Sequence, residues 1–340
     1  MLKDPTAPHH PQARGGPLQR GHAHTVLGPV PADSLGVVAV HEALLSVVPG
    51  AEHGYDISMD RADIFEVLAA KLRAFKAAGG GTVVDSTGMF HGRDVPLLEN
   101  LSRATGVHVV ASTGMGPEEN LGGYFLTPQT NPPTPWPAEK FADLFGREVT
   151  EGMVVPRVER RGAAGLVATT GTRGGLTPTD ESLFRGAARA AVATGVPVSI
   201  RYGADAVAEL ELVLAEGLPA DRVVVGDLDR AGAVAAGWPA AVAERGAYVA
   251  IDHVGRNDDD AFVRDADRAA LVAELVAAGH AHRVLLSGNA VGVAKGHAPY
   301  ELPYAHALTA FAPLLAARGV GDADIQQILV ANPRDLLAVR

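Results

Sequence analysis

Two histidines one residue apart, His22 and His24, lie near the start of the chain in the segment GHAHTVLGPV. Alternate side chains of a β-strand point to one face, so the two imidazoles could bind one metal ion together. The segment borders a leader that also contains His9 and His10, which indicates that histidine is simply frequent there. We therefore expect that His22 and His24 do not form a metal site.

Ionisable side chains also end several short Val-rich runs. His41 ends GVVAVH, Arg201 ends GVPVSIR and Asp227 ends DRVVVGD. A histidine exchanges protons near neutral pH, and an arginine can hold a carboxylate or phosphate through two parallel hydrogen bonds. These residue types fit acid–base chemistry on an anionic substrate, provided that the fold brings the run ends together.

Eight Val-rich runs alternate with Ala- and Leu-rich amphipathic stretches along the chain. The predicted strands cover 36–41, 81–87, 106–113, 163–170, 195–201, 221–227, 246–252 and 282–288, and the clearest helices cover 61–79, 179–195 and 267–279. Thr179 should begin the second of these helices and Gly195 should end it. Near-continuous apolar strands between helices indicate a parallel sheet buried on both faces. Eight units predict an α/β fold of the (β/α)8 TIM-barrel type, in which chemistry lies at the carboxyl ends of the strands.

The composition favours one large domain with a short leader. Residues 1–24 are rich in Pro, Gly and His, which predicts a flexible leader, and residues 25–340 hold the barrel. The net charge of −10 and the lack of any basic block argue against a nucleic-acid or anionic-membrane partner. The absence of cysteine excludes disulfides, thiolate metal sites and cysteine nucleophiles.

With no apolar run of about 18 residues and no signal-peptide pattern, we expect a cytoplasmic protein. The abundant Ala and Gly, with Arg exceeding Lys, suggest a bacterial source.

Several stretches, in order, make the chain resemble the phosphotriesterase family of the amidohydrolase superfamily. They are TVLGPVPADSLGVVAVHEALL (25–45), the segment 83–114 with GRD at 92–94, GLTPTDESLFRGAARAAVATGVPV (175–198), VVVGDLD (223–229) and VLLSGN (284–289). The resemblance implies a TIM barrel, which can form a homodimer, and hydrolysis of phosphotriesters, lactones or related esters. It also implies a binuclear metal centre, which would activate a bridging water. Its ligands would be a His-x-His on the first strand, a carboxylated Lys or a Glu on the fourth, histidines on the fifth and sixth, and an Asp on the eighth.

Carried over one position at a time, five of these six ligands are replaced. His41 keeps the first, whereas the others fall on Ala43, Ala168, Arg201, Asp227 and Asn289. No histidine lies between His108 and His253, so a small shift of the alignment restores none on strands four to six. We therefore expect no metal cofactor.

The resemblance places Arg201 and Asp227 on adjacent strand ends, pointing inward as an ion pair. One interpretation is a structural plug that fills the former metal site. The other is an anion site, in which Arg201 binds substrate while His41 and Asp227 form an acid–base pair. Asn289 can donate and accept hydrogen bonds but cannot act as a base.

Other residues of the expected mouth carry weaker predictions. Asn289, Asp252 and His253 are candidate substrate contacts. Asp252 should also partner neighbouring strand ends, and His253 should line the pocket. Tyr124 lies in the long Pro-rich segment 116–140, which suggests a lid or an oligomer contact, and is a candidate substrate contact.

Three functional hypotheses follow. The favoured one is a metal-independent enzyme of lyase, isomerase, cyclase or transferase type, acting on a small anionic or carbonyl-containing metabolite in specialised metabolism. The second is a non-catalytic pseudoenzyme that binds a ligand or a protein partner. The third is a hydrolase of esters, lactones or phosphotriesters with an altered mononuclear metal site.

Overall fold

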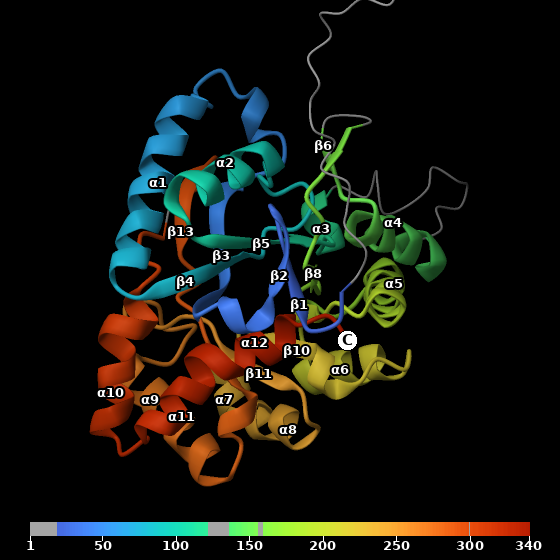
Figure 1. Cartoon of the computed structure of the whole chain (residues 1–340). Coiled ribbons are helices and arrows are strands. Elements are labelled where there is room, and N and C mark those ends of the chain that lie inside the picture. The colour runs from blue at the N-terminus through green and yellow to red at the C-terminus, as the bar shows by residue number, and fades with distance from the viewer. Residues whose placement is uncertain (1–18, 122–135, 156–158, 299) are drawn as a thin grey trace, which may run out of the picture.

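The structure, a computed structural model, describes residues 19–121, 136–155, 159–298 and 300–340. A nine-stranded parallel sheet curls into a barrel with helices outside it (Figure 1). Its strands are, in spatial order, β12 (Val284–Leu286), β11 (Tyr248–Ile251), β10 (Val223–Gly226), β9 (Val198–Arg201), β8 (Leu166–Thr170), β5 (His108–Thr113), β4 (Gly80–Asp85), β3 (Val37–Val47) and β13 (Val291–Lys295). The TIM-barrel prediction is confirmed, and each predicted strand contains or overlaps an observed one.

The eighth strand is broken in two, and the break closes the barrel. β12 pairs with β11 on one side, whereas β13 pairs with β3 on the other. Between them, the backbone N–H of Ala43 donates to the carbonyl of Ala290 at 3.0 Å. The carboxyl end of β12 therefore opens into the mouth of the barrel instead of continuing as a regular strand.

The helices pack outside the strands, and the three that were predicted, over 61–79, 179–195 and 267–279, begin and end within two residues of those bounds. They are α1 (Arg61–Ala77), α2 (Val95–Thr105), α3 (Glu118–Leu121), α4 (Ala138–Thr150), α5 (Pro178–Thr194), α6 (Ala206–Leu214), α7 (Ala231–Ala235), α8 (Trp238–Glu244), α9 (Asp265–Ala277), α10 (Ala312–Ala317), α11 (Asp322–Gln326) and α12 (Asn332–Leu337). The N-cap of α5 is Thr177 and not Thr179. Pro178 suits the first helical position, and Thr177 with Asp180 forms a capping box. Gly195 ends the helix in a left-handed conformation, as predicted.

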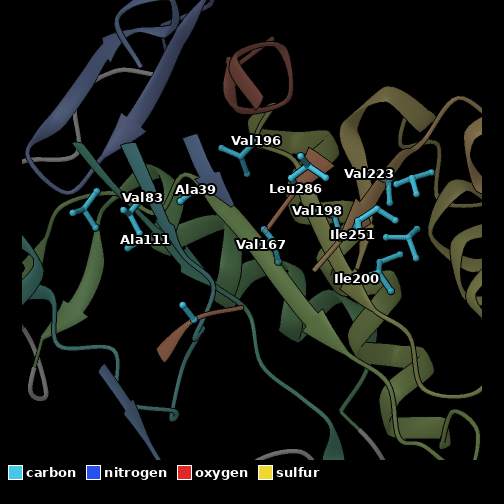
Figure 2. Packing of buried hydrophobic residues seen from close by; sticks show 14 of the residues in the cluster. Ala39, Val83, Ala111, Val167, Val196, Val198, Ile200, Val223, Ile251 and Leu286 are labelled. Atoms are coloured by element: carbon cyan, nitrogen blue, oxygen red, sulfur yellow. The ribbon is translucent and has the colours of Figure 1, made fainter. Parts of the chain in front are cut away.

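Strand alternation separates the interior into two apolar layers. Outward-facing residues such as Val83, Val167 and Ile251 pack in the layer beneath the helices (Figure 2). Inward-facing residues such as Val84 and Val224 fill the barrel itself. Further along each strand the inward positions become polar, so the carboxyl end of the barrel is a polar mouth on an apolar base.

A hairpin closes the opposite end of the barrel and shortens the predicted leader. β1 (His22–Thr25) pairs with β2 (Gly28–Pro31), and Ala23 packs into the inner apolar cluster. The C-terminus lies beside β1, where the N–H of Val339 donates to the carbonyl of His22 at 2.9 Å (Figure 1). Residues 22–24 are therefore a strand and not leader, because backbone pairing and burial order them. Residues 1–18 of the predicted leader lie outside the described residues.

A second short hairpin, β6 (Met153–Val155) with β7 (Glu159–Arg161), follows α4. Within the described ranges, no helix is long and apolar enough to cross a membrane.

Candidate active site

Two cavities occupy the mouth of the barrel, and Arg201 and Asn289 line both. The small cavity, of about 310 Å³, is lined among others by His41, Ala43 and Ala168. The large cavity, of about 710 Å³, is lined by residues that include Asp227, His253, Arg230, Tyr202 and Phe262. The structure thus brings His41, Arg201, Asp227, His253 and Asn289 together, with Asp252 buried beneath them. Tyr124 lies outside the described residues.

The Arg201–Asp227 pair forms, but one carboxylate serves two guanidinium groups. Arg201 Nη2 lies 3.3 Å from Asp227 Oδ1, while Arg230 Nη2 donates to Asp227 Oδ2. The guanidinium of Arg230 also stacks over the ring of Tyr202, 4.6 Å from its centroid. Neither Arg201 Nη2 nor Asp227 Oδ1 has a hydrogen bond of good geometry within the described residues. The cluster of Arg201, Asp227 and Arg230 therefore carries one excess positive charge, and all three residues line the large cavity.

The environment keeps Asp227 ionised. Burial alone would raise the pKa of its carboxyl group, but Arg201, His253 and Arg230 outweigh burial and hold that pKa well below its usual range. Asp227 is consequently a fixed negative charge at neutral pH and a poor proton acceptor.

His41 is hydrogen-bonded to Asp252, whereas the sequence predicted an acid–base pair of His41 with Asp227. His41 Nδ1 lies 2.9 Å from Asp252 Oδ1, and His41 Nε2 lies 2.8 Å from the hydroxyl of Ser199. The other carboxylate oxygen of Asp252 accepts the backbone N–H of Asp227 at 2.7 Å. The physical reason is that the Asp227 carboxylate turns toward the two arginines, leaving only its backbone near Asp252.

A second histidine–carboxylate pair serves the large cavity. His253 Nδ1 lies 2.9 Å from Asp229 Oδ1, and Asp229 Oδ2 accepts from Nε of the fully buried Arg268 at 2.7 Å. His253 Nε2 is 3.5 Å from the side-chain nitrogen of Asn289 and 3.9 Å from Asp227 Oδ1. Burial raises the pKa of Asp229, whereas His253 and Arg268 lower it further than burial raises it. Sequence reasoning missed Asp229 and Arg268, although Asp229 stands only two residues beyond a predicted strand end.

Left-handed backbone conformations occur within β3, where its pairing with β4 is irregular, and just beyond β10 and β12. Among the described non-glycine residues, those with left-handed φ angles are His41 (55°), Phe90 (70°), Asp227 (59°) and Asn289 (46°). Such a conformation costs on the order of 1–3 kcal/mol per residue and persists where the surrounding structure enforces it. Three of these four residues line the mouth, which is the pattern expected of a site that aims side chains across the barrel.

Glu42 holds the broken eighth strand in place beside His41. Its carboxyl oxygens accept from the hydroxyl of Ser287 and the N–H of Gly288, both at 3.1 Å, and from the N–H of Ala290. Burial raises the pKa of Glu42 to about 8, against the opposing effect of these donors. The folded state therefore retains a proton on Glu42 that the unfolded chain releases near its ordinary pKa of 4.5.

This difference predicts a pH dependence of stability. Because the folded state binds more protons between about pH 4.5 and pH 8, the free energy of unfolding due to Glu42 falls as pH rises through that window. We expect Glu42→Gln to reduce that decline by a few kcal/mol, measured by urea denaturation from about pH 5 to pH 9. If the free energy of unfolding changes with pH in the same way in wild type and Glu42→Gln, Glu42 ionises equally in the folded and unfolded states.

The residues at the implied ligand positions do not fit a binuclear metal centre. Ala43 and Ala168 offer no ligand atom, and the guanidinium of Arg201 puts a positive charge at the third position. Both ring nitrogens of His41 are engaged, by Asp252 and Ser199. Across the described parts of the chain, no cluster of three or more His, Cys, Asp or Glu side chains is arranged to hold a metal ion. His22 and His24 lie in β1 at the other end of the barrel.

Known proteins match this chain over almost its whole length. A phosphotriesterase homology protein of Mycobacterium tuberculosis is 28% identical over 327 residues, covering 92% of this chain and 96% of the relative. An N-acetyltaurine hydrolase of Tetraodon nigroviridis is 26% identical over 362 residues, covering 94% and 99%. The solved structure of a mutant phosphotriesterase-like lactonase of Deinococcus radiodurans superposes with a TM-score of 0.81 at 26% identity, covering 93% and 99%.

These similarities correct the expected reaction class. Relatives and structural neighbours that match almost end to end are named as hydrolases and lactonases, so the prediction of a lyase, isomerase, cyclase or transferase is wrong. The sequence model of the phosphotriesterase family matches residues 21–337. The chain is therefore a member of the phosphotriesterase family.

Proposed function

We propose that the protein is a hydrolase of small esters or lactones, and that its preferred substrates carry a negative charge. The observation that carries this proposal is the position of Arg201, whose guanidinium borders both cavities and has hydrogen-bonding capacity to spare. The names of the relatives and of the lactonase structure support the hydrolase class.

The mouth holds the two kinds of group that hydrolysis of a carbonyl bond needs. One is a proton acceptor for the nucleophile, and the other stabilises the negative oxygen of the tetrahedral intermediate. The pairs His41–Asp252 and His253–Asp229 bring imidazole groups to the two cavities. Arg201 lies between the cavities and can hold either the oxyanion or a substrate carboxylate.

We further propose that this hydrolysis needs no metal ion, because three of the positions at which the family holds its metal ligands are occupied here by Ala43, Ala168 and Arg201. Protein dialysed against EDTA should hydrolyse 4-nitrophenyl acetate within about twofold of its untreated rate, and added Zn²⁺ or Mn²⁺ should not raise that rate. Loss of activity with EDTA, its restoration by one of these ions and stoichiometric bound metal would together contradict metal independence while leaving the hydrolase assignment intact.

A role in binding without catalysis is the second candidate. Ala43 and Ala168 favour it, because both replace ligands without adding a reactive group. A panel of 4-nitrophenyl esters, lactones and phosphotriesters separates the two: turnover of any of them above the buffer rate, abolished by heat denaturation, supports the hydrolase.

The setting of the reaction is also a proposal. The Ala-, Gly- and Arg-rich composition supports a bacterial source, and we propose a cytoplasmic role in specialised metabolism. Neighbouring genes that encode a specialised-metabolite pathway would support this setting, and a housekeeping context would contradict it.

A further inference from the structure

Ser199 completes a chain of three side chains within the barrel. Its hydroxyl lies 2.8 Å from His41 Nε2, and His41 Nδ1 lies 2.9 Å from Asp252 Oδ1. In a Ser–His–Asp triad, the serine hydroxyl is hydrogen-bonded to Nε2 of the histidine and the carboxylate to Nδ1. This arrangement identifies a serine nucleophile in unrelated folds. The three residues come from β9, β3 and the end of β11, so the barrel itself assembles them.

With Asp252 as an acceptor, the contacts assign a direction to each hydrogen bond. An ionised carboxylate can only accept, so Asp252 selects the imidazole tautomer that carries its proton on Nδ1. His41 Nε2 then presents a lone pair, and the Ser199 hydroxyl donates to it. Asp252 is itself held by the N–H of Asp227 at 2.7 Å, and His41 by its constrained backbone with φ of 55°. The hydroxyl is therefore already aligned with its base.

Ser199 is buried just below the small cavity's lining, and the residues next to it line that cavity. His41 and Arg201 line the cavity, and so does Ala168, which is the direct partner of Ser199 in the β8–β9 pairing. Ser199 and Arg201 are two residues apart on one strand and face the same side. The alanines at 43 and 168 leave room in the cavity where larger side chains would fill it, and Arg201 Nη2 has no hydrogen-bond partner among the described residues.

We propose that Ser199 is the catalytic nucleophile, with His41 as its general base and Asp252 as the positioning residue of that base. This inference rests on the proposed hydrolase function. Ser199 Oγ attacks the carbonyl carbon and its proton passes to His41 Nε2, while the oxyanion faces Arg201. The bond to the leaving oxygen breaks, and that oxygen takes the proton from His41. Water then gives a proton to His41 and attacks the acyl carbon, the bond to Oγ breaks, and Ser199 recovers the proton.

Diisopropyl fluorophosphate tests the nucleophile without any knowledge of the natural substrate. Attack by Ser199 forms an O–P bond and releases fluoride, which leaves a stable mass increase on the full-length protein. Trypsin should release residues 190–201, a peptide whose only serine is Ser199. We expect the label on this peptide, none in Ser199→Ala, and labelling slowed by about 100-fold or more in His41→Ala and Asp252→Asn.

Ser102→Ala is the matched control. Ser102 and Ser199 are both 3% exposed, but the hydroxyl of Ser102 donates to the carbonyl of Val107 at 2.8 Å instead of to an imidazole. Ser102→Ala should therefore be labelled by diisopropyl fluorophosphate at the wild-type rate.

Ser199→Ala should also lower kcat for 4-nitrophenyl acetate by about 10⁴-fold. Its melting temperature should stay close to that of wild type, because the change removes a single oxygen.

The outcomes separate this inference from the proposed function. If Ser199→Ala still hydrolyses esters and wild-type Ser199 takes no label, Ser199 is not the nucleophile. The protein is then a hydrolase in which His253 activates water. A label on Ser199 that depends on His41, without turnover of any ester or lactone, supports the nucleophile and overturns the hydrolase function. Absence of both label and turnover overturns both.

Discussion

Replacing Arg201 with alanine should lower kcat/KM by about 10³-fold for the anionic ester 4-nitrophenyl hemisuccinate and by about 10²-fold for neutral 4-nitrophenyl acetate. The part common to both esters reflects the loss of the group that faces the developing oxyanion. The extra tenfold for the anionic ester reflects the loss of a charge-assisted contact to its carboxylate. Steady-state kinetics on the two esters measures both parts.

The cluster around Asp227 should tolerate the loss of Arg201. Arg230 remains paired with Asp227 in Arg201→Ala, so the buried carboxylate keeps a cation, and the fold should survive. Arg201→Lys keeps the charge but loses the planar fork, and should recover only part of the activity. Equal losses for the two esters in Arg201→Ala would contradict an anion site and leave only the oxyanion role. No loss for either ester would support the structural plug.

Arg230→Ala provides a comparison within the same cluster. Arg230 shares Asp227 with Arg201, yet its guanidinium is occupied by that carboxylate and by the face of Tyr202. We expect a smaller loss of kcat/KM than in Arg201→Ala, because Arg230 has less capacity left for substrate. The contrast between the two variants distinguishes direct contact with substrate from a general change of charge in the mouth.

The barrel is predictable from the sequence because each strand is a short apolar run with its own turn residues. The break in the last strand is not predictable in this way. The run HRVLLSG ends at Gly288, and the following VGVAK reads as a loop until it pairs with β3. What holds the break is Glu42, which is 245 residues distant from Ser287 along the chain. Such a long-range contact leaves no local signal.

Contacts within the site are predictable from the sequence only where the two residues lie on adjacent strands. Arg201 and Asp227 end adjacent strands, β9 and β10, so their ion pair follows from strand order. The partner of His41 depends instead on how left-handed backbone angles turn the side chains, which residue types do not specify. Ser199 had one signal, since strand alternation places it on the same face as Arg201. A serine within an apolar run is nevertheless easily taken for a filler of the interior.

Arg268→Met should destabilise the protein by about 3–5 kcal/mol, because it leaves a buried charge without its partner. Arg268 is fully buried, and its guanidinium donates to Asp229 at 2.7 Å and to Asp265 at 2.8 Å. Methionine keeps much of the apolar stem, so the effect reports chiefly on the charge. Urea denaturation at neutral pH measures the loss in free energy of unfolding.

Adding Asp229→Asn to Arg268→Met should recover part of this loss, because both charges are then gone. The pH dependence gives an independent check. With Arg268 present, the lowered pKa of Asp229 stabilises the folded state above the ordinary carboxyl range, and that stabilisation disappears as pH falls. Without Arg268, burial should raise that pKa and let the folded state take up a proton, so the deficit relative to wild type should shrink in acid. A double variant as unstable as Arg268→Met at every pH would instead assign the effect to packing of the arginine stem. In that case Asp229 would orient His253 without needing a cation behind it.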